Sequence, residues 1–120
     1  MRKPTFDFDF SPGKVGDFLN HIDRTLPLTH EDNVVWLSED CYWISYSDWT
    51  YIIDVDWYPS MNPEGSFTVR LVDNPKGSPD DEDWVSPYDK PLLQRECRTL
   101  EELEVILKEF HEEVLKKLAE

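Results

Sequence analysis

The sequence of 120 residues is poor in the features that mark several large classes of protein. It has two cysteines, four glycines and three histidines, and its twelve basic residues are outnumbered by acidic ones. Charged residues interrupt every apolar run well before the roughly 20 residues that a membrane span requires. No apolar signal-peptide core follows the basic residues Arg2 and Lys3. We therefore expect a soluble, cytoplasmic protein that makes no contact with a membrane.

The few cysteines and histidines form no catalytic or metal-binding motif. Cys41 and Cys97 have no metal-ligating neighbours in the sequence, and we expect both to be reduced and to fill small spaces near the core. The dipole of a helix that begins after Cys97 would lower the pKa of its thiol. His21, His30 and His111 lack the i, i+4 spacing of a zinc motif, so we expect ordinary surface or boundary residues. Since the sequence also has no glycine-rich phosphate loop, we expect no catalysis, no cofactor and no bound metal.

Acidic and aromatic residues are the two types that the sequence has in excess. Twenty-six Asp and Glu give a net charge of −14, and five Trp, five Tyr and six Phe accompany them. So many aromatic residues exclude a disordered acidic tail and place the charges on the outside of one folded domain over residues 1–120. Such a surface repels nucleic acid and anionic lipid, and it attracts a basic protein.

Hydrophobic periodicity predicts a helix near each end of the chain. Ser11-Pro12 is a typical helix start, and an apolar stripe from Val15 to Leu26 follows it before Pro27. A capping box at 99–102 begins a second helix, whose apolar stripe continues to Leu118. Before both helices, the alternation of Phe and Asp over residues 6–10 predicts a half-buried strand with its rings turned inward.

The middle of the chain is predicted to form strands over 34–38, 42–47, 49–58 and 66–73, with a short edge strand at 92–96. The strand 49–58 would turn Trp49 and four further apolar residues to one face and its two aspartates to the other. Arg70 would lie across from one of these aspartates. We expect an α+β fold, in which an antiparallel sheet of about five strands has the N-terminal helix and the long C-terminal helix packed on one face.

Asp54 and Asp56 are the one carboxylate pair with a spacing that suits chemistry. At i, i+2 on a strand, both side chains share a face and can hold a divalent cation, as in some metal-dependent transfer enzymes. The same spacing arises on the solvent face of any amphipathic strand, and Asp7 and Asp9 repeat it. We therefore predict that Asp54 and Asp56 are solvated and bind no metal.

A second acidic group is the run Asp80, Asp81, Glu82 and Asp83, which is followed by Trp84. Its spacing does not fit an EF-hand, which requires ligands at alternating positions around a glycine. The run combines negative charge with an aromatic anchor, and both suit a basic protein partner. Trp43 is a further tryptophan that we expect at the surface, because its alternate neighbours along the strand are small or polar.

Four short stretches resemble the small acidic immunity proteins that accompany bacterial polymorphic toxins of the contact-dependent inhibition and Rhs types. They lie between Glu64 and Glu104 and span about a third of the chain. The stretches are 64–69 at a strand start, 83–84 and 91–92 after it, and 97–104 at the start of the last helix.

The resemblance implies a bacterial, cytoplasmic protein that binds one cognate toxin domain, often a basic nuclease, and blocks its active site or substrate groove. It implies neither catalysis nor a cofactor, and no site residue is carried over from the family. Charge and exposure alone select the expected partner-binding residues, which are Asp54, Asp56, Asp80, Asp81, Glu82, Asp83 and Trp84. Two alternatives remain open: a metal-dependent enzyme built on Asp54 and Asp56, and an acidic adaptor that binds a basic peptide.

Overall fold

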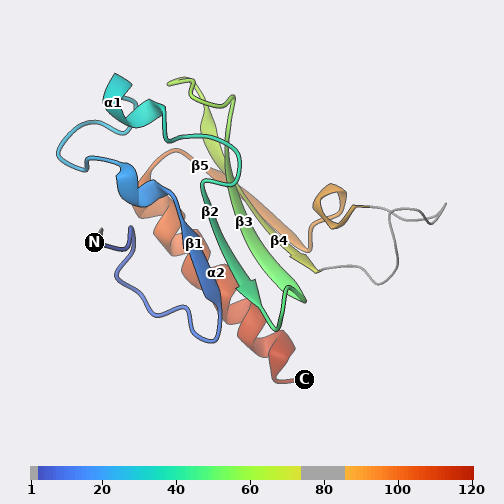
Figure 1. Cartoon of the computed structure of the whole chain (residues 1–120). Helices are drawn as coiled ribbons and strands as arrows, with labels where there is room; N and C mark the ends of the chain where they lie inside the picture. Colours follow the sequence, from blue (N-terminus) through green and yellow to red (C-terminus); the bar gives the residue numbers. More distant parts are fainter. Residues whose placement is uncertain (1–2, 74–85) are drawn as a thin grey trace.

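The computed structural model describes residues 3–73 and 86–120, and it contains one antiparallel sheet in which each strand pairs with the next along the chain (Figure 1). The strands are β1 (Lys14–Asp17), β2 (Tyr42–Tyr46), β3 (Tyr51–Tyr58), β4 (Ser66–Asp73) and β5 (Leu93–Cys97). The helical segments are the 3-10 turns η1 (Leu19–His21) and η2 (Pro87–Asp89), the short helix α1 (Glu31–Val34) and the long helix α2 (Leu100–Leu118). The prediction of an α+β fold with a five-stranded antiparallel sheet and a C-terminal helix is confirmed.

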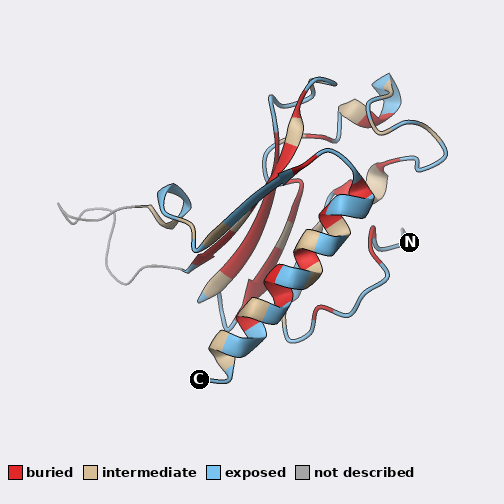
Figure 2. Ribbon diagram, turned by 180° about the vertical axis from the view of Figure 1, so that it is seen from behind, coloured by how far each residue is buried: buried red, intermediate tan, exposed pale blue. Residues whose placement is uncertain are grey.

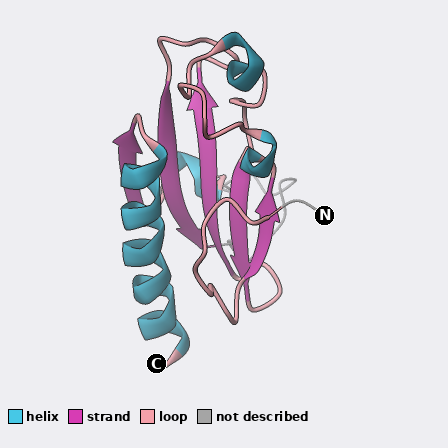
Figure 3. Cartoon of the chain, turned by 90° about the vertical axis from the view of Figure 1, so that its left-hand side faces the viewer, coloured by secondary structure: helices cyan, strands magenta, loops and turns pink. Residues whose placement is uncertain are grey.

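The long helix α2 covers one face of the sheet, against β3, β4 and β5 (Figures 2 and 3). Its buried stripe consists of Leu100, Leu103, Leu107, Phe110, His111 and Val114. Thr99 caps α2 as predicted: its hydroxyl oxygen accepts the Glu102 N–H at 3.1 Å, and the hydroxyl donates to the Glu102 carboxylate at 3.0 Å, a bond that takes the place of the backbone bond of a full capping box. Among the described residues, no helix combines the length and apolar character that a bilayer crossing demands.

The central strand β3 carries the core. Ile53, Val55 and Trp57 point toward α2 and are completely buried. They lie opposite Leu71, Val69 and Phe67 of β4, which are also completely buried. The alternation of the sequence therefore predicted the inward face of β3 correctly, although the strand begins at Tyr51 and not at Trp49.

The predicted N-terminal strand over residues 6–10 is wrong, because this segment is not a strand and pairs with none of the five described strands. It crosses the same face of the sheet as α2, where Phe6 meets Tyr42 and Phe10 meets His111 in edge-to-face contacts. The segment is fastened by Thr5, whose amide and hydroxyl both donate to the Asp17 carboxylate. Phe6 and Phe10 are buried as predicted, whereas Phe8 is 38% exposed, so the alternation predicted the position of only two of the three rings.

The predicted N-terminal helix over residues 11–26 is also wrong. The chain forms the edge strand β1 and the short turn η1 there. Gly16 pairs with Trp43 of β2, and a Cβ atom at Gly16 would lie 2.0 Å from the Trp43 ring. Gly16 is a poor residue for the helix that the sequence predicted. In the structure its missing side chain leaves the space into which Trp43 packs.

The predicted strand over residues 34–38 is replaced by α1 and the turns that follow it. His30 caps this helix by accepting the Asp32 N–H at 3.1 Å. The buried side chain of Asn33 accepts the Asp23 N–H at 2.8 Å and donates to the Pro27 carbonyl at 2.9 Å. These bonds satisfy backbone N–H and carbonyl groups of a turn that is not paired with a described strand. The apolar residues after Asn33 have a spacing that resembles a strand pattern, which explains the wrong prediction.

We expect Thr99→Ala to lower the free energy of unfolding by about 1 kcal/mol, because it removes the acceptor that caps α2. Thr99→Ser keeps the hydroxyl and is the matched control, with a loss well below that of the alanine variant. Urea unfolding followed by far-UV circular dichroism measures both. Equal stability of the alanine variant and the wild type would show that the cap contributes nothing.

Candidate functional site: an acidic cleft on the sheet

The face of the sheet opposite α2 holds two buried carboxylates. Asp54 and Asp56 alternate with the core residues of β3, and each side chain therefore points away from the helix. Each is only 4% exposed. The prediction that both aspartates are solvated is wrong, because β3 is the central strand and its second face is also covered. Tyr88 of η2, although exposed itself, lies over this face beside both aspartates.

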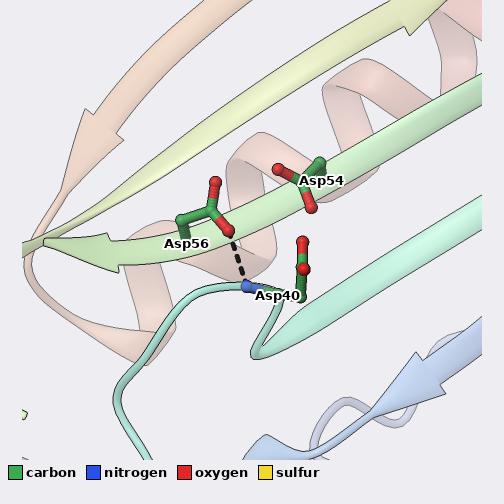
Figure 4. Close-up of side chains that lie close together, drawn as sticks. All are labelled: Asp40, Asp54 and Asp56. Carbon is green, nitrogen blue, oxygen red and sulfur yellow. Dashed lines mark hydrogen bonds between the residues drawn. The ribbon is translucent and has the colours of Figure 1, made fainter. Parts of the chain in front are cut away.

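Asp40 brings a third carboxylate to the same place. It precedes β2 in a turn, with a left-handed φ of 53°, which aspartate tolerates better than most residues. Its N–H donates to the Asp56 carboxylate at 2.6 Å. One oxygen from each of Asp40, Asp54 and Asp56 can be chosen so that all three lie within 4.8 Å of one another, as Figure 4 illustrates.

Sequence reasoning missed Asp40, although the hairpin register contains the signal. β2 and β3 pair antiparallel with Tyr42 opposite Val55, which places the residues just before β2 beside the residues just after Val55. The backbone bond from the Cys41 N–H to the Val55 carbonyl extends this pairing. Had 42–47 and 49–58 been joined as a tight hairpin, Asp40 would have been predicted beside Asp56.

Arg70 is the basic residue at this site. Its Nη1 lies 3.4 Å from the Asp56 carboxylate, and its Nε donates to the Gln94 side chain at 3.2 Å. The expected pairing of Arg70 with one of the two aspartates is confirmed for Asp56. Asp54 lies directly opposite Arg70 in the ladder, yet no donor in the described part of the chain bonds to its carboxylate.

Aromatic residues wall this site. A cavity of about 260 Å³ is lined by Asp40, Asp54, Ile52, Trp43, Trp49 and Tyr88. A neighbouring cavity of about 300 Å³ is lined by Glu39, Asp40, Asp54, Asp56, Tyr58, Arg70 and Tyr88. We call these two adjoining cavities the acidic cleft.

Both tryptophans of the acidic cleft differ from expectation. Trp43 is half-buried, which is less exposed than predicted, and its ring centroid lies 5.1 Å from that of Trp49. Trp49 was assigned to the inward face of the strand, but it lies in the turn before β3 with a φ of 69° and is 44% exposed. The left-handed backbone breaks the alternation and turns this ring to the outer face beside Trp43.

Burial is the largest cause that raises the pKa of Asp54, to about 9, and the neighbouring carboxylates of Asp56 and Asp40 add to the shift. Asp54 is therefore protonated at neutral pH when the cleft is empty. An entering cation would exchange with that proton, because it stabilises the ionised form.

The remaining candidate groups do not join this site. Cys41 and Cys97 are buried near the core, as predicted, but burial raises the pKa of both thiols, to about 11 for Cys97, and thereby contradicts the predicted lowering by the helix dipole. His111 is buried under the sheet and not at the surface, with Nδ1 2.7 Å from the Tyr46 hydroxyl. The run Asp80, Asp81, Glu82 and Asp83, with Trp84, lies outside the described residues. Within the described ranges, only the three aspartates gather in a manner that suits a metal ion.

Comparisons with known proteins add no identity to this geometry. No family model matches the chain, and neither the curated proteins nor the solved structures contain a match. The site must therefore be interpreted from its own chemistry. Three clustered carboxylates beside aromatic side chains have the chemistry to accommodate a cationic group.

We expect the stability of the wild type to fall between pH 7 and pH 9. In this interval the native Asp54 still holds a proton that the unfolded chain has lost above its ordinary pKa, so a rise in pH favours unfolding, by at most about 1.4 kcal/mol per pH unit. Asp54→Asn keeps the shape of the protonated acid and should flatten this slope. Urea unfolding at pH 7, 8 and 9 measures the difference.

Asp7→Asn is the matched control, because it makes the same side-chain substitution at an exposed aspartate. It should keep the slope of the wild type. Parallel pH profiles for the wild type and Asp54→Asn would mean that Asp54 is ionised throughout this interval.

Proposed function

We propose that this protein is a cytoplasmic bacterial immunity protein, which binds a cognate toxin domain and blocks its active site or substrate groove. The observation that carries the proposal is the acidic cleft, which lies on the sheet face that α2 leaves free. A protein with a net charge of −14 would attract a basic domain from a distance and repel nucleic acid. The partner that suits it is a basic, nuclease-like domain.

The acidic cleft has the composition of a protein-binding surface. Trp49 is 44% exposed, Tyr88 42% and Tyr58 41%, so three aromatic side chains surround the buried carboxylates. Tyrosine and tryptophan are enriched among the residues that dominate binding energy, whereas exposed single charges contribute mainly to the rate of association. The cleft therefore offers anchoring contacts as well as long-range attraction.

Two sets of residues are proposed to contact the toxin. Asp54 and Asp56 form the floor of the acidic cleft, where a partner's basic side chain would reach them past Asp40. The run 80–83 with Trp84 supplies further charge and a further aromatic ring, by the sequence argument given above. These charges would resemble the phosphates that a nuclease normally binds.

A metal-dependent enzyme is the second candidate, and the position of Asp40 favours it. Three carboxylates within 4.8 Å are a suitable set for a divalent cation. However, both Asp56 oxygens are engaged, one by the Asp40 N–H and the other by Arg70. A cation that used Asp56 would have to compete with Arg70, which makes protein binding the better supported function.

The test is direct binding of the C-terminal domain of a secreted toxin encoded next to this gene. We expect the wild type to bind that domain and to protect cells that express it. Replacing residues 80–83 by Asn and Gln should slow association about tenfold, weaken its salt dependence and leave the melting temperature nearly unchanged. Biolayer interferometry across a salt series and a growth assay measure these effects.

The matched control removes four exposed acidic charges, at Glu101, Glu109 and Glu112 of α2 and at Glu120 after its end. It has the same net charge as the loop variant but leaves the acidic cleft and the loop intact, so association should be affected less. Identical effects of the two variants would indicate attraction by net charge alone. Absence of both binding and protection would contradict the immunity function, and turnover that depends on Mg²⁺ or Mn²⁺ would favour the enzyme.

A further inference from the structure

We infer that the acidic cleft is a socket for one lysine side chain of the partner protein, whose ammonium group would lie between Asp40, Asp54 and Asp56. The inference rests on the proposed function, because it names the group that the partner inserts. It also assigns a role to Asp54, which the fold itself does not use.

Asp54 is the observation that requires a ligand. Its side chain is 96% removed from solvent, being 4% exposed, and in Figure 4 it lies beside Asp40 and Asp56. Among the described residues, two further carboxylates lie beside it and no cation pairs with it, since Arg70 is engaged with Asp56 and Gln94. A buried ionised carboxylate without a cationic partner is unfavourable. Asp54 therefore holds a proton that it shares with Asp56 or Asp40, in line with its raised pKa, and a cation in the acidic cleft would take the place of that proton.

The arrangement of the oxygens fits an ammonium group. An ammonium group has three donors, and acceptors at hydrogen-bond distance from its nitrogen lie roughly 4.6 Å apart. The three carboxylates offer one oxygen each within 4.8 Å of the others. An arginine fork binds both oxygens of one carboxylate in a plane, which these three separate carboxylates do not favour.

The walls of the acidic cleft fit the rest of a lysine side chain. Trp43, Trp49 and Ile52 line the cavity of about 260 Å³ that opens above Asp40 and Asp54. A four-carbon stem packs along such apolar surfaces while its charged end reaches the acids. An ammonium group close to an indole face also gains a cation–π attraction.

A divalent ion is less well served by the same residues. Ca²⁺ takes six to eight oxygen ligands, and Mg²⁺ requires nearly octahedral geometry. Because the Asp40 N–H and Arg70 engage both oxygens of Asp56, only Asp40 and Asp54 are free to turn toward an ion. A group with one positive charge therefore matches the site better than a divalent ion. It would be shared by Asp40 and Asp54 and would contact Asp56 more weakly.

The experiment is an NMR titration of the isotope-labelled protein at pH 7.5 with Nα-acetyl-lysine N-methylamide. We expect saturable shifts of the Trp43 and Trp49 indole signals with a dissociation constant on the order of millimolar to tens of millimolar. The Asp54 carboxyl carbon should move toward its ionised value as the amine replaces the proton. The norleucine analogue, which has the apolar stem without the charge, should produce neither effect.

Two variants and three further probes complete the test. Asp54→Asn should weaken lysine binding at least tenfold, whereas Asp7→Asn on the exposed N-terminal segment should leave it unchanged. The arginine analogue should bind more weakly than the lysine analogue. The socket is overturned if the norleucine analogue shifts the signals equally, if the lysine analogue shows no saturation, or if CaCl₂ or MgCl₂ alone saturates the site at lower concentration. The last result would assign the acidic cleft to a metal.

Failure of this inference is separable from failure of the proposed function. If the toxin domain binds but the lysine analogue does not, the immunity function stands and the toxin contacts another surface. If the lysine analogue binds and no toxin domain does, the socket stands and the cognate partner is of another kind.

Discussion

The burial of β3 on both faces is the constraint on which the rest of this structure depends. The central strand of a five-stranded sheet has neighbours on both sides, and α2 closes one of its faces. Ile53, Val55 and Trp57 then form the core with β4, as any amphipathic strand would allow. The unusual consequence is on the other face of β3. The alternation of side chains along the strand places Asp54 and Asp56 there, and both are buried as well.

Those aspartates are accommodated in different ways. Asp56 is held by the Asp40 N–H and Arg70, an arrangement that satisfies its charge within the fold. Asp54 receives no such partner among the described residues, and burial together with its neighbours keeps it protonated. Sites that bind ligands often retain groups that do not favour folding, because the ligand supplies the missing interaction. Under the proposed function Asp54 would be such a group, whereas Asp56 is held by bonds within the fold.

The proposed interaction joins the global charge of the protein to this local site. A net charge of −14 acts over a distance and speeds the approach of a basic domain, but charges that remain solvated add little to the stability of a complex. The acidic cleft adds a place where a cation would be desolvated between carboxylates and aromatic rings. Steering and anchoring would then be performed by different residues.

Local sequence patterns predicted a helix or strand correctly where the same few residues determine both the element and its packing. The strand 66–73 has the predicted bounds, and the capping box at Thr99 marks the beginning of α2, because alternation and capping act over a few neighbouring residues. Segments 6–10, 11–26 and 34–38 were wrong, because apolar spacing does not record which backbone groups are paired, and each segment also exposes apolar side chains such as Phe8, Phe18 and Trp36. Phe6 and Phe10 are buried with no strand around them.

The sequence by itself determined the fold class, the long helix and the acidic character of the surface. Only the tertiary structure decided that Asp54 and Asp56 are buried, that Trp49 faces outward, and that Asp40 completes the acidic cleft. The physical reason is that the environment of a side chain depends on what covers it. Asp40 lies fourteen or more positions from its two partners, and only the pairing of β2 with β3 brings the three carboxylates together.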